Sequence, residues 1–367
     1  MMTEASKTIV LVIDSLVGGG AERSVLTIAG GLADRGWRII LLSLFPPTDY
    51  PIPSGVTHVQ LSTTSGNSDR RLAHKMATQL DETRKQFGEP ALVLVNLVRS
   101  CRVASLVDFH SAPVYFIIRN PLAAQTRATR ALVRGALERH RLRRLFRRRN
   151  VIGISPGVID DLVDDLGARP RQAIVIPNPF DIEEIRTRAA IGNDAAHAMR
   201  PFVLCVGHFK RQKRQDLALR GWAEAGVDAD LVFLGDGSRR KKRRLQALAQ
   251  RLGCGDRVHI LGWQPDVYAW IAAAELLLVT SDFEGFGRVI VESLAVDTPV
   301  VSTDCPSGPR DILTGALSNG LAPMGDVQAI SERIQMVMGQ TPAIEESHLD
   351  RFRLENVLDQ YESLVTQ

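Results

Sequence analysis

Residues 9–32 read IVLVIDSLVGGGAERSVLTIAGGL, and this stretch decides the fold of the N-terminal part of the chain. The uninterrupted apolar run at 9–13 is typical of a parallel strand that is buried on both faces. Three glycines at 18–20 follow it, and then Val25, Ile28, Ala29 and Leu32 recur at helical spacing. The stretch therefore predicts a strand, a glycine-rich turn and a helix, which is the opening unit of an α/β fold.

The same alternation of strand and helix continues along the chain, in two series that restart near residue 200. Between the series, residues 177–200 are rich in polar residues and turn formers and have little apolar surface to bury, so the domain junction is placed there. We therefore predict an α/β fold of two Rossmann-like, doubly wound domains that face each other across a cleft, beside the carboxyl ends of their strands. Further strands are expected at 38–44, 91–95, 114–118, 151–154 and 173–176, and then at 202–206, 231–234, 258–261, 276–279 and 299–302.

The composition is that of an ordinary globular protein, with 45% hydrophobic and 23% charged residues in a chain of 367. The longest apolar runs, at 91–95 and 271–279, are much shorter than the roughly 20 residues of a membrane-spanning helix. The first residues also lack the pattern of a signal peptide, so we expect a cytoplasmic protein. The four cysteines form no CxxC pair and no zinc-like cluster with histidine, which predicts reduced core cysteines and no metal site.

Positive charge is concentrated in one segment, residues 127–149, which holds ten arginines and one glutamate. Its local charge of +9 leaves −5 for the rest of a chain whose total is +4. Such a local feature indicates a localised anionic partner. Three interpretations are open: docking to an anionic membrane surface, nucleic-acid binding, or a solvated helix. Phe146 is the only aromatic residue in the segment, which argues against stacking on single-stranded nucleic acid.

Four motifs follow predicted strands. The glycines of residues 16–23 let a ligand approach the backbone at a helix N-terminus, although a simple tight turn explains them equally well. Residues 205–215, CVGHFKRQKRQ, place four basic side chains in one loop, which suits a diphosphate or, alternatively, a solvated charge run. Residues 234–244, LGDGSRRKKRR, combine a glycine turn with a basic helix face that is expected to be solvated. Residues 281–293, SDFEGFGRVIVES, place Glu284 in a loop and Glu292 in the following helix, where carboxylates can hold sugar hydroxyls or, in the alternative, only coat the surface.

Together these motifs resemble those of the retaining glycosyltransferases of family 4, which have the two-domain GT-B fold. The matching segments, which cover nearly the whole chain, are Gly19–Glu22, Val206–Gly207 with Gln212–Lys213, Gly235–Gly237, Asp256–Gly262, Glu284 with Glu292, and Thr298–Val301. Residues 304–313 and 118–121 are similar to those of a subgroup that builds bacterial surface glycans. The resemblance implies an N-terminal domain at 1–185, a nucleotide-sugar domain at 186–348 and a C-terminal helix at 349–367 that crosses back to the first domain.

The resemblance also implies roles for individual residues. Lys213 would bind the donor diphosphate, Glu284 the donor sugar and Glu292 the ribose. Lys213 and Glu284 are thus candidate catalytic residues together with Arg119, which stands where many relatives have histidine. The remaining candidates for donor binding are Gly19, Gly20, His208, Gly285, Phe286 and Gly287, and those for membrane or acceptor contact are Arg143, Arg144, Arg147 and Arg148.

The sequence departs from the family pattern at two further positions. His208 replaces the usual arginine near the lysine, so a fixed positive charge is missing there. Asp297 replaces a glycine before Thr298, and aspartate tolerates a left-handed backbone better than most residues.

The implied activity is transfer of a hexose or N-acetylhexosamine from a UDP-sugar to a lipid-linked or glycan acceptor, for lipopolysaccharide or exopolysaccharide, at the cytoplasmic face of the inner membrane. The resemblance implies retention of configuration, independence of metals and no cofactor, and we expect no nucleic-acid partner. Two alternatives stay open: a nucleotide-sugar epimerase of the same fold, and a non-catalytic protein that binds anionic polymers through residues 127–149.

Overall fold

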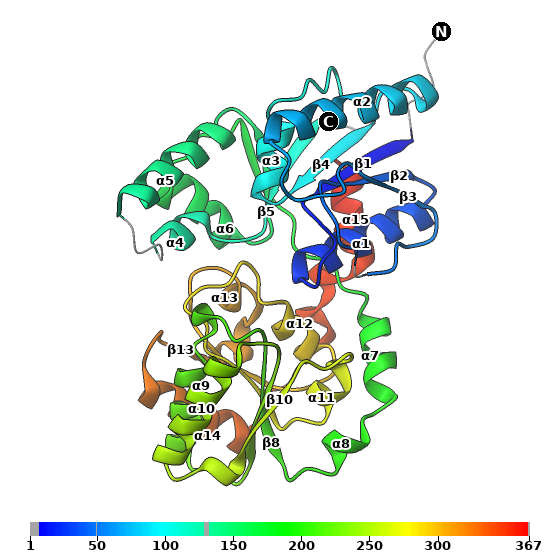
Figure 1. Cartoon of the computed structure of the whole chain (residues 1–367). Helices are drawn as coiled ribbons and strands as arrows, with labels where there is room; N and C mark the ends of the chain where they lie inside the picture. Colours follow the sequence, from blue (N-terminus) through cyan, green and yellow to red (C-terminus); the bar gives the residue numbers. More distant parts are fainter. Residues whose placement is uncertain (1–6, 49, 128–131, 366–367) are drawn as a thin grey trace. The chain divides into compact units, whose positions relative to one another are not determined.

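The computed structural model describes residues 7–48, 50–127 and 132–365, with the side chains of 132–134 left out. The chain divides into two compact units (Figure 1). Unit 1 comprises residues 1–180 and 352–367, and unit 2 comprises residues 181–351.

Unit 1 is built on a seven-stranded sheet whose neighbouring strands all run parallel, in the order β3-β2-β1-β4-β5-β6-β7. The order reverses between β1 and β4, which makes the sheet doubly wound, as the sequence predicts. The strands are β1 (Thr8–Ile13), β2 (Arg38–Ser43), β3 (Val56–Gln60), β4 (Leu92–Asn96), β5 (Val114–Ile118), β6 (Asn150–Gly153) and β7 (Gln172–Val175). The helices are α1 (Gly20–Asp34), α2 (Asp69–Phe87), α3 (Val98–Ala104), α4 (Leu122–Arg127), α5 (Leu132–Phe146), α6 (Pro156–Asp160) and α15 (Leu354–Glu362).

Helix α1 is the predicted helix after the glycine turn, and it buries Val25, Ile28, Ala29 and Leu32 as its spacing indicates. Helix α1 also packs against the C-terminal helix α15. A Cβ atom on Gly31 would lie 2.7 Å from Leu358, so the glycine permits a close helix–helix approach.

Unit 2 repeats the same design with a six-stranded sheet in the order β10-β9-β8-β11-β12-β13, again parallel throughout. Its order reverses between β8 and β11. The strands are β8 (Phe202–Val206), β9 (Asp230–Leu234), β10 (Val258–Gly262), β11 (Leu276–Val279), β12 (Val300–Thr303) and β13 (Leu321–Ala322). The helices are α7 (Ile182–Ala190), α8 (Asp194–His197), α9 (Gln215–Ala225), α10 (Arg239–Arg251), α11 (Tyr268–Ala272), α12 (Arg288–Leu294), α13 (Pro309–Ile312) and α14 (Val327–Gly339).

The division between the units differs slightly from the predicted boundaries after residues 185 and 348. The structure divides the chain after Phe180 and after Arg351. The reason is a pair of backbone hydrogen bonds inside unit 1: Phe180 N–H donates to the Phe352 carbonyl at 2.8 Å, and Leu354 N–H donates to the Phe180 carbonyl at 2.9 Å. The expected C-terminal helix begins at Leu354, after two short 3-10 turns.

In the part of the chain that the structure describes, none of the helices combines the length and the apolar character needed to cross a membrane.

Three of the cysteines, Cys101, Cys205 and Cys305, are buried, and all four are free thiols. Burial raises the pKa of the Cys305 thiol to about 12, so this cysteine stays protonated and inert at neutral pH.

Candidate active site

The candidate site in unit 2 lies at the point where the strand order of its sheet reverses. Strands β8 and β11 are neighbours there, and Phe202–Val206 and Leu276–Val279 both point their carboxyl ends to the same edge. The loop after β8 carries Lys213 and the loop after β11 carries Glu284. In open α/β sheets this position is where ligands bind, so the topology brings together two predicted residues that are far apart in sequence.

Lys213 and Glu284 form a direct ion pair, with 2.6 Å between Nζ and Oε1. The Glu284 side chain is only 9% exposed and that of Lys213 is 24% exposed. Ser281 Oγ donates a second hydrogen bond to the same carboxylate oxygen at 2.5 Å. The carboxylate is therefore held on one oxygen, Oε1, while the lysine stays accessible from solvent.

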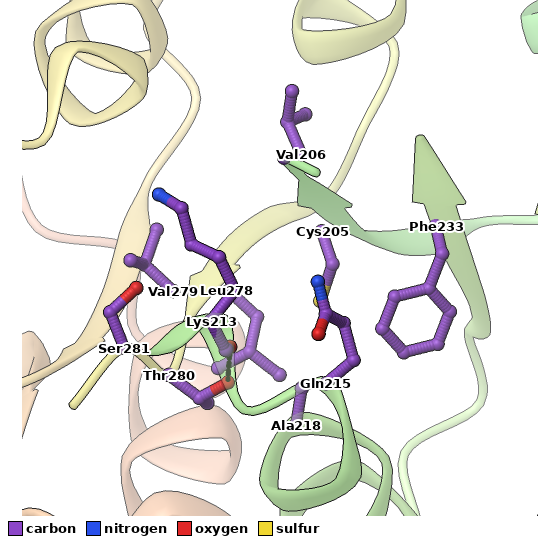
Figure 2. A pocket seen from close by; sticks show the side chains of 11 residues that line it. Cys205, Val206, Lys213, Gln215, Ala218, Phe233, Leu278, Val279, Thr280 and Ser281 are labelled. Carbon is purple, nitrogen blue, oxygen red and sulfur yellow. Dashed lines mark hydrogen bonds between the residues drawn. The ribbon is translucent and has the colours of Figure 1, made fainter. Parts of the chain in front are cut away.

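The loop that carries Lys213 is fixed to the end of β11. Thr280 Oγ1 donates to the carbonyls of Lys213 and Arg214, at 3.2 and 2.9 Å. Figure 2 shows the Lys213 and Ser281 side chains on one side of a small cavity and those of Gln215 and Phe233 on the other. The cavity of about 20 Å³ has room for about one water molecule, so a larger ligand would lie outside it, against the lysine.

Glycine is required at the base of this loop. Gly207 has φ 148°, and a Cβ atom there would lie 3.4 Å from Lys213 Cε. The lysine stem therefore lies directly on the backbone that follows β8.

The predicted donor-binding loop, Gly285–Gly287, is buried and leads into helix α12. Gly287 adopts a left-handed conformation with φ 87°. Residues 307 and 308 hold the loop in place. Ser307 Oγ donates to the Glu284 carbonyl at 2.5 Å. Gly308 packs so closely against the loop that a Cβ atom on it would lie 2.2 Å from the Phe286 carbonyl oxygen. The backbone of the loop is thus positioned by Ser307 and Gly308, which belong to the segment 304–313 noted for its family resemblance.

Glu292 lies one turn into α12 and is 5% exposed. Arg288, four residues before it on the same helix, lies 3.5 Å away from Nη2 to Glu292 Oε1. A carboxylate at this position can accept hydrogen bonds from ligand hydroxyls.

His208 is not part of the Lys213–Glu284 cluster. Its side chain is exposed, and its ring forms no hydrogen bond within the described residues. Only its carbonyl is engaged, by Lys210 N–H at 2.6 Å and by Gln215 Nε2 at 3.1 Å.

Arg214, one of the four basic residues of the 205–215 loop, has a left-handed backbone with φ 46° and pairs with Asp282 at 3.1 Å. This pair links the same two loops as the Lys213–Glu284 pair. In the sequence, the only sign of the Arg214–Asp282 pair is that these charged residues lie next to Lys213 and near Glu284.

In unit 1, the predicted glycines lie at the start of α1. Gly19 is the N-cap residue with an extended backbone, and a Cβ atom there would lie 2.2 Å from a Glu22 carboxylate oxygen. Gly20 is the first residue of the helix. Glycine at position 19 thus leaves room for the Glu22 carboxylate, and this turn lies at the carboxyl end of β1, next to the reversal point of this sheet.

Arg119 follows β5 and is 6% exposed. Its Nε and Nη2 donate to Asn96 Oδ1 at 3.1 and 2.7 Å, and its Nη1 donates to Asn178 Oδ1 at 2.7 Å. Burial raises the pKa of the nearby Tyr361 hydroxyl to about 12, and the positive charge of Arg119 opposes that rise. Two asparagines at the ends of other strands therefore fix this guanidinium, and neither was predicted.

The predicted membrane-contact residues belong to α5 and the turn after it; residues 128–131 of the basic segment lie outside the described residues. Helix α5 is continuous from Leu132 to Phe146. Its inner side buries Leu142 and Phe146, while Leu137 is 49% exposed. Arg143 Nε donates to the Leu166 carbonyl, and Arg144, Arg147 and Arg148 are exposed.

Two family models match consecutive parts of the chain. The one described as glycosyltransferase family 4 matches residues 18–184, and the one described as glycosyl transferases group 1 matches residues 189–348. The first model covers the glycine turn and Arg119, and the second covers Lys213, Glu284 and Glu292.

Curated relatives match part of the chain. One is N-acetylgalactosamine-N,N'-diacetylbacillosaminyl-diphospho-undecaprenol 4-alpha-N-acetylgalactosaminyltransferase of Campylobacter jejuni, 35% identical over 43% of this chain and 42% of the relative. Another is lipopolysaccharide 1,6-galactosyltransferase of Escherichia coli K12, 32% identical over 48% of each chain. The matched segments thus span less than half the length of these relatives.

Solved structures match nearly the whole chain. HepE from Anabaena, in complex with UDP and glucose, has a TM-score of 0.79 with 20% identity over 98% of this chain and 99% of that one. The apo form of the lipopolysaccharide outer core galactosyltransferase WaaB has a TM-score of 0.71 with 19% identity over 98% and 99%. These likenesses show the fold, which is GT-B with two Rossmann-like units.

Proposed function

Because the chain belongs to the group 1 and family 4 glycosyltransferases, we propose that it is a retaining enzyme of bacterial surface-glycan biosynthesis. It moves a hexose or N-acetylhexosamine from a UDP-sugar to a lipid-linked or glycan acceptor. The observation that carries the proposal is the Lys213–Glu284 pair of 2.6 Å at the reversal point of the unit 2 sheet. The printed names of the Campylobacter and Escherichia relatives, with their diphospho-undecaprenol and lipopolysaccharide acceptors, support the choice of acceptor class.

The two partners have separate tasks toward the donor. Lys213 Nζ has three N–H donors and uses one on Glu284, so the others are free to meet the diphosphate. Glu284 receives both of its hydrogen bonds on Oε1, from Lys213 and Ser281, which leaves Oε2 to accept a sugar hydroxyl. Backbone groups of Gly285–Gly287 approach the sugar and phosphate, and Glu292 accepts the ribose hydroxyls.

In the transfer step, the bond between the anomeric carbon and the diphosphate oxygen breaks, and a bond from the acceptor oxygen to the anomeric carbon forms. The acceptor proton passes to an oxygen of the departing phosphate. Negative charge grows on the diphosphate, and a preorganised cation such as Lys213 stabilises it more in the transition state than in the ground state. Arg119, held by Asn96 and Asn178, is a fixed positive charge in unit 1 for the acceptor or the donor phosphate.

The basic helix is proposed to hold the enzyme at the cytoplasmic face of the inner membrane. Exposed Leu137 shares its helix with exposed Arg144, and Arg147 and Arg148 follow at the helix end, with Arg143 beside them. Each basic residue near an anionic surface contributes about 1 kcal/mol. If Arg144→Glu with Arg147→Glu does not reduce flotation with vesicles that contain phosphatidylglycerol, this part of the proposal is wrong.

The activity is tested by incubating the full chain with a panel of UDP-sugars and undecaprenyl-diphosphate-linked or lipopolysaccharide-core acceptors, and by identifying the product. Lys213→Ala is expected to lower kcat/KM by about 10²- to 10³-fold. Arg220→Ala removes an exposed cation from α9 of the same unit and is expected to leave it unchanged. Full transfer by Lys213→Ala would contradict the site, and interconversion of free UDP-sugars without transfer would favour an epimerase.

A further inference from the structure

A second polar hollow lies in unit 1, at the amino ends of β5, β6 and β7. Its volume is about 630 Å³, which is within the range of small-molecule sites. The lining comes from the loop before β5, the residues before β6 and β7, and Leu364 near the C-terminus. Four separate segments of the chain thus form one concavity, and neither the family resemblance nor the proposed active site accounts for it.

The charge of this hollow is strongly positive. Arg148, Arg149 and Arg171 line it, and Asp108 is the one carboxylate among the lining residues. Asp108 Oδ1 accepts the backbone N–H of His110 at 2.9 Å, so it is already engaged within its own loop. An anion is therefore the ligand that the lining favours.

The arginines are held at fixed backbone positions. Arg148 N–H donates to the Arg169 carbonyl and Arg171 N–H donates to the Arg149 carbonyl, both at 2.8 Å. Arg149 is also fixed through its side chain, because its guanidinium lies 5.4 Å from the Phe116 ring centroid. The two segments therefore present their arginines from one paired stretch of backbone.

Two of these guanidinium groups are available. Within the residues that the structure describes, the side chains of Arg148 and Arg171 form neither a hydrogen bond nor an ion pair, and both are exposed. Arg148 also has a left-handed backbone, with φ 57°, where a chain that leaves a helix usually has glycine or asparagine. Arginine does not favour this left-handed conformation, which indicates a role for the Arg148 side chain.

Neutral donors complete the lining. Gln172 accepts a hydrogen bond from the Tyr115 hydroxyl on Oε1 at 3.4 Å, which leaves its Nε2 free to donate. Ser111 adds a hydroxyl, and Asn150 adds an amide whose Nδ2 also donates to the Val114 carbonyl at 3.4 Å. Planar guanidinium groups with several neutral donors match the tetrahedral oxygens of a phosphate, which arginine binds in bidentate fashion.

We propose that this hollow is a phosphate-binding site, separate from the glycosyl-transfer site. The separation follows from the sheet, because Arg119 lies after the carboxyl end of β5 and the hollow lies at its amino end. Five residues of strand separate the two by roughly 16 Å. The phosphate is that of a lipid headgroup or of a soluble phosphate compound, and the same side chains serve both.

The test compares two double variants of the full chain that lose the same charge. Arg148→Gln with Arg171→Gln removes the two available guanidinium groups. Arg70→Gln with Arg71→Gln removes two exposed arginines from the start of α2, which follows the carboxyl end of β3 at the opposite edge of the sheet. Thermal unfolding of both variants confirms that they are folded.

Inorganic phosphate is titrated calorimetrically, with citrate as a non-phosphate anion. We expect saturable phosphate binding that weakens at least tenfold in the Arg148/Arg171 variant and less than twofold in the Arg70/Arg71 variant. Absence of phosphate binding, equal loss in both variants, or equal affinity for citrate would overturn the proposal.

Flotation with vesicles of phosphatidylglycerol and phosphatidylcholine identifies the source of the phosphate. Flotation that free phosphate inhibits, and that the Arg148/Arg171 variant loses, supports a headgroup. Phosphate binding without such inhibition supports a soluble ligand. Arg148 is also one of the residues proposed above for membrane contact. Loss of flotation in Arg144→Glu with Arg147→Glu, with phosphate affinity retained, separates the hollow from the rest of that basic surface.

Discussion

Removal of the Lys213 side chain should lower the free energy of unfolding, because it breaks the ion pair with Glu284. The substitution Lys213→Ala deprives Glu284 of its cation, and the Glu284 side chain is 9% exposed. Breaking a buried ion pair from one side costs about 3–5 kcal/mol when nothing replaces the lost partner. Here Ser281 Oγ still donates to the same carboxylate oxygen, and the lysine is 24% exposed, so we expect a smaller loss of about 1–3 kcal/mol in the free energy of unfolding.

A double-mutant cycle isolates the pair. In Lys213→Ala with Glu284→Gln the uncompensated charge is gone, so the loss should be less than the sum of the two single losses by about 1–2 kcal/mol. The assay is urea unfolding followed by tryptophan fluorescence, which reports mainly on unit 2, since Trp222, Trp263 and Trp270 lie there and only Trp37 lies in unit 1. Additive single effects, or a Lys213→Ala variant within about 0.3 kcal/mol of the unchanged protein, would refute the reasoning.

Three further outcomes are expected. Asn96→Ala removes the acceptor of two Arg119 hydrogen bonds, so thermal unfolding should show a lower Tm and a loss of about 2 kcal/mol; an unchanged Tm would contradict the role of Asn96. Gly308→Ala places a Cβ atom 2.2 Å from the Phe286 carbonyl at a φ of 90°, so UDP affinity measured by calorimetry should fall at least tenfold, and retained affinity would show that the loop tolerates the shift. Burial lowers the pKa of His58 below 6.5, so the unfolded state takes up the proton first as the pH drops. The free energy of unfolding therefore falls as the pH drops below about 6.5. His58→Gln should flatten this part of the pH profile measured by urea unfolding, and an identical profile would exclude His58 as its source.

Most of the strands that the sequence predicted are buried on both faces, although the edge strands β7 and β10 were also predicted and are partly exposed. β1 and β4 are buried along their whole length, and their uninterrupted apolar runs stand out in the sequence. β3 was missed because it is an edge strand with alternating half-buried and exposed residues, VTHVQ, in which no apolar run forms. β13 was missed because it has only two residues.

Local conformational rules also transferred well. Asp297 was expected to tolerate a left-handed backbone, and its φ is 59°. The boundary between the units was less predictable, because it depends on the backbone hydrogen bond between Phe180 and Phe352, which are 172 residues apart. Neither segment has a local sequence pattern that indicates this pairing.

The candidate site shows the same limit. Lys213 and Glu284 were each predicted from local motifs, but their ion pair joins residues 71 positions apart and follows from the adjacency of β8 and β11. The asparagines that hold Arg119 come from the ends of two other strands, where a single Asn has no distinctive local pattern. Motifs thus pick out individual candidate side chains, and the sheet order decides which of them lie together.

Calorimetric titration with UDP, GDP and ADP asks whether unit 2 is a nucleotide-sugar site. The account predicts saturable binding of UDP that Glu292→Ala abolishes and that Glu224→Ala, which removes an exposed carboxylate from α9, leaves intact. Preference for GDP or ADP would contradict the UDP-sugar assignment. Absence of binding by all three nucleotides would contradict the donor site itself.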